Sequence, residues 1–385
     1  MGEHDHPDDC AYPFRNEFIL VHLLCLAAFW SGVTVQALAL GFALYLLRIF
    51  AISAGYHRYF AHRSFQTSRI FQFLLGFLAQ TSAQRGVLWW VAHHRRHHKY
   101  ADTEFDVHSP ILRGFLYAHI GWIFAPANLV TAHEAVRDLA RYPELRWLDR
   151  QPFLSATLLA FITWLVAGWP GLIVGFCWST VAVWHATFTI NSLAHLFGRR
   201  RYITGDHSRN NWFLALLTMG EGWHNNHHSY QVSARLGFHW WEYDPTFYVL
   251  KVLSYVGLVW DLHVPPRVLV EGEQRLGRNV IEKAAAQLAV SFPIDTIASH
   301  VLVALERSPT REELRARILS AQGAAEAFWA EIDLSELPTL DDIRSYAAAR
   351  LPQTPSLDEI AVCARQRLLQ LVYARLVVQT ASGPG

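Results

Sequence analysis

The stretch His94-Arg95-Arg96-His97-His98 decides how this chain is read, and it returns about 130 residues later as His224-Asn225-Asn226-His227-His228. Both stretches follow the pattern His-x-x-His-His. Residues three and four apart lie on one face of a helix, so each stretch, if helical, directs its three imidazoles towards one point. Imidazole nitrogen is a ligand for zinc, copper, iron and nickel. The two stretches therefore predict the two halves of one metal site, rather than a basic surface with incidental histidines.

The composition is that of a membrane protein with a soluble part. Of the 385 residues, 52% are hydrophobic and only 17% are charged, whereas a soluble domain has about 25% charged residues. The net charge of +1, without an arginine-rich or zinc-finger pattern, gives no indication of a nucleic-acid partner, and none is expected. Cys10, Cys25, Cys177 and Cys363 lack CxxC spacing and predict neither a disulfide framework nor thiolate metal ligands.

Four apolar runs predict four transmembrane helices, because about 20 apolar residues cross a bilayer core. They cover roughly residues 18–35, 37–55, 153–169 and 172–197 and pair as two hairpins. The turns of the hairpins, at Ser31–Gln36 and Gly168–Gly171, contain no Lys or Arg, while the histidine clusters and nearly all basic residues lie on the other side. The positive-inside rule then places the histidine-rich side and both chain ends in the cytoplasm.

The predicted fold is an all-α membrane protein with a cytosolic histidine-rich cap and a small helical C-terminal domain. Residues 1–16 form a polar tail without the features of a signal peptide, and residues 17–265 form the membrane domain. Residues 266–385 form a helical cytosolic extension without a catalytic motif. Within it, Thr310 to Glu313 and Ser356 to Glu359 fit the capping box that begins a helix.

Polar residues inside the apolar segments need separate explanations. Arg48 is expected to reach the membrane interface rather than face the protein interior. Residues 70–91 are interrupted by polar side chains and predict a helix half-embedded at the interface or packed inside the protein. His185 lies deep in the last span and is expected to be a structural, hydrogen-bonded histidine.

Two further pairs of candidate residues, one of two histidines and one of an asparagine and a histidine, lie at the ends of the spans. His57 and His62 are five residues apart, which leaves them about 140° apart on an ideal α-helix, so the helix must end or bend between them if both bind one metal. Asn191 and His195 are four residues apart and share one face at the end of the last span.

Nine histidines converge on the cytosolic side: His57, His62, His94, His97, His98, His195, His224, His227 and His228. A tetrahedral zinc ion takes four ligands, so nine are too many for one ion. Two metals with five and four nitrogens fit better, and O2-activating redox chemistry at a dinuclear iron centre is the natural use. The polar turn with Asp102, Glu104, Asp106 and His108 either orients ligand imidazoles or is a solvated loop.

The histidine motifs resemble those of a known family. HRYFAH at 57–62, HRRHH at 94–98, NSLAH at 191–195 and HNNHH at 224–228 resemble the histidine boxes of the membrane-bound fatty acyl desaturases, most closely the bacterial form of the stearoyl-CoA (delta-9) desaturases. The resemblance covers roughly residues 15–265. It implies a four-span, mushroom-shaped fold with a cytosolic cap, a di-iron centre, and removal of two hydrogens from a saturated acyl chain.

The resemblance also implies a division of the ligands. His57, His62, His94, His98 and His227 would bind one iron, and His97, His195, His224 and His228 the other. Asn191 would hold a water on the second iron. His93 stands where animal relatives typically carry an acidic residue, and it is not expected to be a tenth ligand.

The implied partners are a long-chain acyl-CoA, or another acyl carrier or lipid, together with O2 and membrane lipid. Some relatives carry a haem domain with an HPGG motif, which His6-Pro7-Asp8-Asp9 does not match. Electrons are therefore expected from a separate ferredoxin, rubredoxin or cytochrome b5 type protein, with no haem or flavin in this chain. The expected location is the bacterial inner membrane.

Three alternatives stay open at this point. A di-iron fatty acyl or lipid hydroxylase would insert oxygen at a similar site. A metal- or lipid-binding membrane protein without enzyme activity would tolerate the loss of single histidines. A di-zinc membrane hydrolase would work without O2 or a reductant, since zinc has no redox role.

Overall fold

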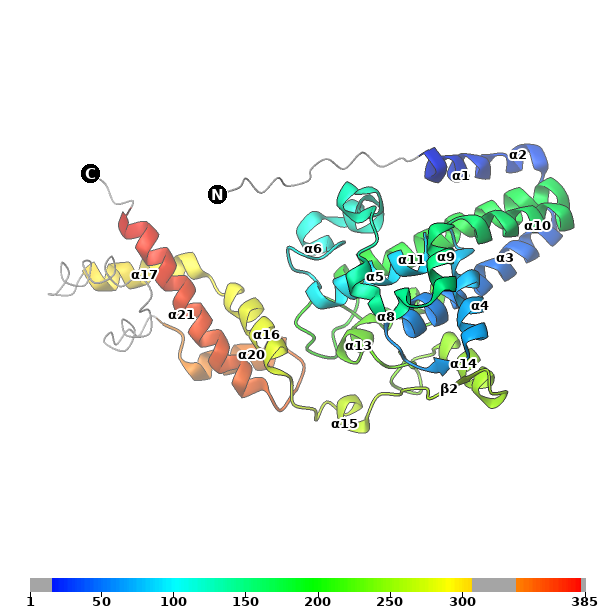
Figure 1. Cartoon of the computed structure of the whole chain (residues 1–385). Helices are drawn as coiled ribbons and strands as arrows, with labels where there is room; N and C mark the ends of the chain where they lie inside the picture. Colours follow the sequence, from blue (N-terminus) through cyan, green and yellow to red (C-terminus); the bar gives the residue numbers. More distant parts are fainter. Residues whose placement is uncertain (1–15, 307–336, 382–385) are drawn as a thin grey trace. The chain divides into compact units, whose positions relative to one another are not determined.

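The computed structural model describes residues 16–306 and 337–381, which form two units (Figure 1). The first unit runs to Arg201 and resumes from His207 to Pro266, and the second comprises Tyr202–Asp206 and the chain from Arg267 onwards. The capping box predicted at Thr310 to Glu313 and residues 1–15 of the predicted tail lie outside the described residues.

The first unit is predominantly helical. Its helices are α1 (Asn16–Leu26), α2 (Ala28–Ser31), α3 (Val35–Phe50), η1 (Ala51–Ala61), α4 (Arg69–Gln80), α5 (Val87–Tyr100), α6 (Pro110–Arg113), η2 (Tyr117–Gly121), α7 (Trp122–Phe124), η3 (Pro126–Asn128), η4 (His133–Val136), α8 (Arg137–Ala140), α9 (Pro143–Arg150), α10 (Leu154–Pro170), η5 (Gly171–Trp178), α11 (Ser179–Leu196), α12 (Trp212–Leu217), α13 (His224–Ser229) and α14 (Pro245–Tyr255). The strands of the described part, β1 (Gln66–Thr67) and β2 (Val259–Trp260), form one short antiparallel pair. The predicted predominance of helix is confirmed.

Among the described residues, two helical stretches are long and apolar enough to cross a membrane. They are Val35–Ala61, which joins α3 to η1, and Leu154–Leu196, which joins α10, η5 and α11. The second stretch breaks at Ala167 and Gly168, whose backbone angles are not helical. The apolar segment Asn16–Ser31 is shorter. Membrane association therefore follows, while the four spans and the sides of the membrane stay predictions.

The breaks between the apolar helices lie where the sequence predicts its two hairpin turns. The first falls between α2 and α3, and the second within Leu154–Leu196 at Gly168, whose φ of +62° lies in the left-handed region that favours glycine. The rings of Trp30 and Trp169, beside the two breaks, have centroids 5.5 Å apart. Both breaks therefore lie at the same end of the first unit, where α2, α3 and α10 meet (Figure 1).

The prediction for Arg48 is wrong, because this side chain is fully buried inside the protein. Its Nη1 donates to Thr180 Oγ1 at 2.7 Å, its Nη2 donates to the hydroxyl of Ser179, and its Nε donates to the Leu44 carbonyl at 3.1 Å. Two hydroxyls of α11 and one carbonyl of α3 itself thus satisfy the guanidinium without an aqueous interface. Arg48 ties α3 to the start of α11.

Residues 70–91 form two helices rather than the single predicted one. The α4 helix ends at Gln80 and α5 begins at Val87. The N-terminus of α5 is capped from a distance, since Asp149 Oδ1 accepts hydrogen bonds from the backbone N–H groups of Leu88 and Trp89, both at 3.0 Å. A Cβ atom at Gly86 would lie 2.1 Å from that same oxygen, so only glycine fits there. The carboxylate therefore fixes where the helix with the first histidine triplet begins.

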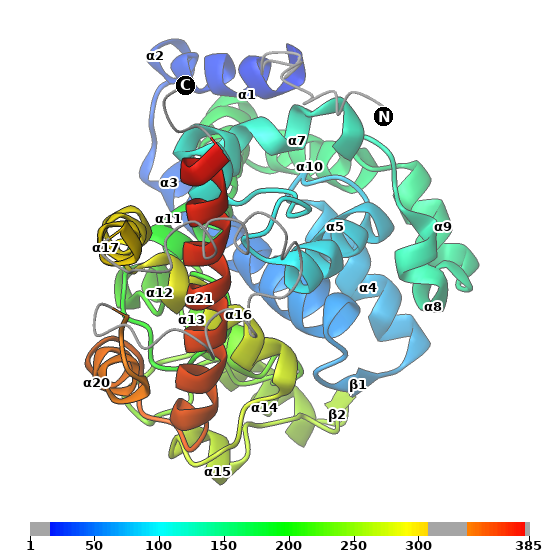
Figure 2. The same ribbon diagram turned by 90° about the vertical axis from the view of Figure 1, so that its left-hand side faces the viewer.

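The second unit is a helical bundle with its own apolar core. Its described helices are α15 (Arg267–Val270), α16 (Arg278–Val290), α17 (Ile294–Glu306), α20 (Leu340–Arg350) and α21 (Leu357–Ala381). The long α21 contacts α16, α17 and α20 (Figures 1 and 2). Ile203, from the short segment Tyr202–Asp206, belongs to this core. The helix predicted to begin after Ser356 is present as α21.

Candidate metal centre

The nine predicted histidines come together in the first unit as two groups. The first group is His57, His62, His94, His98 and His227, and the second is His97, His195, His224 and His228. Within each group the candidate ligand nitrogens lie within 4.8 Å of one another. This division is the one that the family resemblance implies. The two triplets supply ligands to both groups, so α5 and α13 lie along both halves of the centre.

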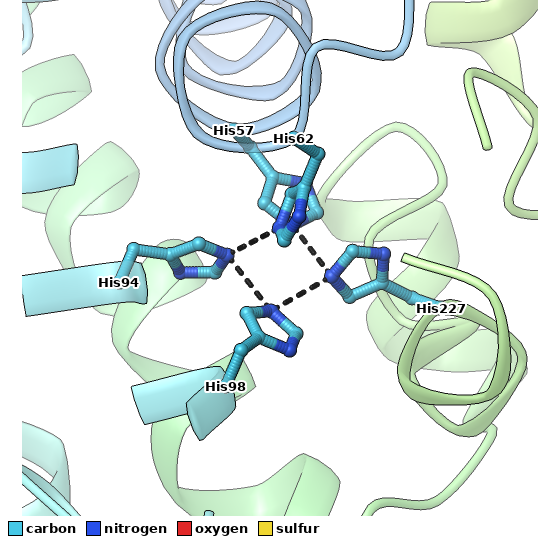
Figure 3. Close-up of side chains that lie close together, drawn as sticks. All are labelled: His57, His62, His94, His98 and His227. Atoms are coloured by element: carbon cyan, nitrogen blue, oxygen red, sulfur yellow. Dashed lines mark hydrogen bonds between the residues drawn. The ribbon is translucent and has the colours of Figure 1, made fainter. Parts of the chain in front are cut away.

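The five rings of the first group point to a common centre (Figure 3). The Nε2 atom of His57 lies 2.9 Å from that of His227, and the Nε2 atom of His62 lies 2.8 Å from that of His94. His98 Nε2 is 3.0 Å from His94 Nε2 and 2.9 Å from His227 Nε2. Two nitrogens that bind one ion at right angles, each about 2.1 Å from it, are about 3.0 Å apart. The spacing therefore fits one shared ion.

A π-helix brings His57 and His62 together, so the predicted end or bend between them is replaced by a change of helix type. In η1 the backbone N–H of His62 donates to the carbonyl of His57 at 3.2 Å, a bond across five residues. This widened turn places residues five apart above one another, which an α-helix does not. The ring centroids of the two histidines are 4.8 Å apart.

Two carboxylates of the polar turn after α5 hold ligands of the second group. Asp102 Oδ2 lies 2.9 Å from His195 Nδ1, and Asp106 Oδ1 lies 3.0 Å from His97 Nδ1. Although burial raises it, the pKa of Asp102 is held well below its usual range by His195 and by hydrogen bonds from the imidazoles and Ser109. Of the two interpretations of this turn, the structure favours the one in which it orients ligands.

The other two residues of the turn differ in their surroundings. His108 is buried and its ring stacks on His97, with centroids 4.3 Å apart, whereas Glu104 is exposed. His97, Asp106 and His108 also form a third group of possible metal ligands. Because Asp106 contacts the Nδ1 atom of His97, we interpret it as the partner that orients this ring.

Glu221 is a partner of the site that sequence reasoning missed. Its Oε2 atom lies 2.5 Å from His57 Nδ1, and its Oε1 atom accepts a hydrogen bond from Arg58 Nη2 at 3.0 Å. Burial alone raises the pKa of Glu221, but His57 and Arg58 lower it to about 2, so it is a carboxylate at neutral pH. The available signal was its position as the single charged residue within the segment 212–223.

The two asparagines of the second triplet hold the helix that carries it. Asn226 Nδ2 donates to the Leu236 carbonyl and to Glu242 Oε2, both at 2.9 Å. Asn225 Oδ1 accepts from the backbone N–H of Arg201 at 2.7 Å. These bonds fix the short α13, which has only six residues and would not be stable alone.

The protonation of the ligands suits a metal cation. Burial, and then the neighbouring histidines, hold the pKa values of five ligands well below the usual range: His62, His94, His98, His224 and His227. A carboxylate only accepts, so the proton of His57 and that of His195 lies on Nδ1. Their Nε2 lone pairs then face other imidazoles at 2.9 Å and 3.1 Å. A cation at the centre of each group removes the repulsion between such lone pairs.

An apolar cavity of about 230 Å³ reaches the first group at His94. Its lining residues are Glu17, Phe18, Val21, Ala83, Gln84, Arg85, Trp89, Trp90, His94, His108, Trp122, Ile123, Phe124, Phe153, Trp184, Thr187, Phe188 and Asn191. A second cavity of about 50 Å³ is lined by histidines of both groups, among them His57, His94, His97 and His224. Both cavities are lined by Trp90, His94, Thr187 and Asn191. The two cavities together therefore run along the histidine groups.

Two other predicted residues have clear surroundings. His93 is buried, and its Nδ1 atom lies 2.8 Å from the Trp89 carbonyl oxygen, away from both groups. His185 is hydrogen-bonded through both ring nitrogens, as expected of a structural histidine.

Residues 29–261 match the fatty acid desaturase family. An acyl-CoA 5-desaturase of Anemone leveillei is 38% identical over 259 residues, which are 64% of this chain and 78% of that protein. An sn-1 stearoyl-lipid 9-desaturase of Synechocystis sp. is 38% identical, with 65% of this chain and 79% of that protein covered. An sn-2 palmitoyl-lipid 9-desaturase of Nostoc sp. is 36% identical, with 63% and 86% covered.

Proposed function

The chain belongs to the fatty acid desaturase family, and from this membership we propose that it introduces a cis double bond, at the delta-9 position, into a saturated long-chain acyl group. As an acyl desaturase it is an oxidoreductase. The observation that carries the proposal is the apolar cavity that reaches His94 and shares four lining residues with the smaller cavity beside both histidine groups. An acyl chain that extends from the first cavity into the second would expose its methylenes to the centre.

The proposed cofactor is a pair of iron ions. His57, His62, His94, His98 and His227 would hold one, His97, His195, His224 and His228 the other, and Asn191 would hold a water near the second. When bound, the pair would supply the oxidation of two neighbouring methylenes by O2. Two hydrogens leave the acyl chain. Together with two electrons and two protons from outside the protein, they reduce O2 to two waters.

The protein would contribute position and a dry environment. Trp90, which stacks on His94 with centroids 4.8 Å apart, and Phe188 line the cavity beside the centre. A wall in contact with the acyl chain would determine which pair of carbons lies nearest the histidine groups. This positioning would supply much of the selectivity for one double-bond position. Asp102, Asp106 and Glu221 keep His195, His97 and His57 in their orientation throughout.

The remaining partners follow from the same proposal. The acyl group would arrive as acyl-CoA or as part of a lipid, since relatives of both kinds are known. Electrons would come from a separate ferredoxin, rubredoxin or cytochrome b5 type protein. The protein would lie in the bacterial inner membrane as four spans, with the metal centre and both chain ends on the cytoplasmic side. Family membership favours this function over the metal- or lipid-binding membrane protein without enzyme activity and over the di-zinc hydrolase.

The test is the fate of perdeuterated stearate in an aerobic host that expresses the chain, followed by mass spectrometry. The expected product has lost two deuterium atoms and gained no oxygen, and fragmentation places the double bond. His227→Ala should abolish it, while His133→Ala, an exposed histidine outside both groups, should not.

A product that has lost one deuterium and gained one oxygen would instead establish the hydroxylase. If both variants and the parent chain give no product, the iron content of the purified protein separates a missing electron donor from a missing metal centre. Fewer than two irons per parent chain would contradict the proposed cofactor.

A further inference from the structure

Three histidines outside both metal groups form a hydrogen-bonded series. His22 Nε2 on α1 lies 3.1 Å from His185 Nε2 on α11, and His185 Nδ1 lies 3.0 Å from His119 Nε2 on η2. At one end, His22 Nδ1 donates to the Phe18 carbonyl at 2.7 Å. At the other end, His119 Nδ1 lies 3.0 Å from Ser192 Oγ. The series connects three separate helices.

When all three imidazoles are neutral, each nitrogen that faces another ring of the series has one role. A carbonyl only accepts, so His22 carries its proton on Nδ1 and accepts at Nε2 from His185. His185 then accepts at Nδ1 from His119. At the end of the series His119 Nδ1 lies 3.0 Å from Ser192 Oγ, whose hydroxyl donates to the Phe188 carbonyl at 3.0 Å. The nitrogens lie one after another rather than around one point, so the series does not form a metal site. We call this series of His22, His185 and His119 the tie.

The helix at the outer end of the tie is a wall of the larger cavity. Glu17, Phe18 and Val21 of α1 line it, and the Phe18 ring stacks on that of Trp184 with centroids 5.0 Å apart. No residue of α1 is buried, and its opposite side is apolar and exposed, with Leu23 56% exposed. The helix lies at the periphery of its unit in both views (Figures 1 and 2). So thinly packed a wall depends on its few specific contacts.

We propose that His22 is a positioning residue for the acyl chain, because through His185 and His119 it holds α1 in place as the wall of the cavity. The inference rests on the proposed function, which fills this cavity with an acyl chain. Without His22, the Nε2 of His185 loses its partner in an apolar environment, which is unfavourable. Outward movement of α1 would then weaken the binding of the acyl chain and leave the histidine groups intact.

The test compares three variants of the full-length protein in detergent. His22→Phe keeps a ring of similar size beside Phe18 and Trp184 but removes both nitrogens. His22→Gln keeps an amide that can accept from His185. Leu23→Ala, on the exposed side of the same helix, is the matched control. The readouts are hydrogen–deuterium exchange of peptides from residues 16–26, iron content, and the Kd for cis-parinaric acid, a fluorescent 18-carbon chain.

His22→Phe should speed exchange in α1 and raise the Kd for parinaric acid about fivefold, as loss of one hydrogen bond worth about 1 kcal/mol implies. Iron content should stay that of the parent. His22→Gln should recover most of the affinity, and Leu23→Ala should match the parent. If His22→Phe does not accumulate, His185→Asn breaks the same contact from the α11 side and should give the same changes.

Unchanged exchange and unchanged affinity in His22→Phe would overturn the tie. A loss of iron with α1 exchange unaltered would also overturn it, since the residue would then support the metal centre. None of these readouts needs turnover, so an oxygenated product, which would overturn the proposed desaturase function, leaves the tie to be decided by exchange and affinity alone.

Discussion

Asp102 and His195 are 93 residues apart in the sequence, yet Asp102 Oδ2 lies 2.9 Å from His195 Nδ1, and both side chains are almost completely buried. The same oxygen accepts the backbone N–H of His207 at 2.8 Å. One carboxylate thus fixes both the tautomer of a candidate ligand and the start of the chain segment that leads to the second triplet.

Replacing this carboxylate should weaken one metal position selectively. Asp102→Asn keeps the shape but removes the charge that orients His195, and loss of such a partner lowers metal affinity about 10- to 100-fold. We expect about one iron per chain to survive dialysis against a chelator, measured by plasma mass spectrometry. Glu104→Gln, an exposed acid of the same turn, is the control. Equal iron loss in both variants would contradict the role of Asp102.

Arg58 should matter for stability far more than an exposed arginine. Its side chain is 1% exposed and contacts Glu221 at 3.0 Å and Asp244 at 2.9 Å. Arg58→Met leaves two buried carboxylates without their cation, which destabilises by about 3–5 kcal/mol. Thermal unfolding in detergent should show a much lower midpoint than Arg69→Met, because the pair of Arg69 with Glu144 is exposed to solvent and contributes little to stability. Similar midpoints would count against the buried network.

His93 tests whether the centre has a tenth ligand. Its ring packs against that of Trp89, tilted by 34° with centroids 4.4 Å apart, and its Nδ1 lies beside a backbone carbonyl. His93→Phe keeps this ring contact and should retain both irons and the product, with a loss of stability of about 1 kcal/mol from the missing hydrogen bond. His94→Phe, one residue later, should lose iron and activity. Iron loss in His93→Phe would add it to the ligands.

For Arg48 we expect the opposite effect on stability from that expected for Arg58. Its described hydrogen-bond partners are hydroxyl and carbonyl oxygens, with no carboxylate among them. Thr180 and Ser179 also donate to backbone carbonyls, so both hydroxyls keep a partner without the arginine. Arg48→Met should therefore leave the unfolding midpoint unchanged or raised, as often happens when a buried ion is replaced by an apolar group of similar volume. A marked fall in the midpoint would show that the guanidinium is needed.

The sequence by itself determined the local features of this protein. Spacing of three and four residues on a helix marked His94, His97 and His98 as neighbours, because helical periodicity is a property of the backbone. Hydropathy and turn residues, which are also properties of short stretches of sequence, located the breaks near Ser31 and Gly168. Motif order along the chain was enough to indicate the family.

Tertiary structure alone decided what depends on partners distant in the chain. Nothing near Arg48 in the sequence shows that Ser179 and Thr180 replace water around it, and nothing near His57 shows that Glu221 lies 2.5 Å away. The π-helix that aligns His57 with His62 is likewise less stable than an α-helix by itself and depends on its surroundings. Burial and long-range hydrogen bonds set these outcomes, since the free energy of a polar group is determined by what encloses it.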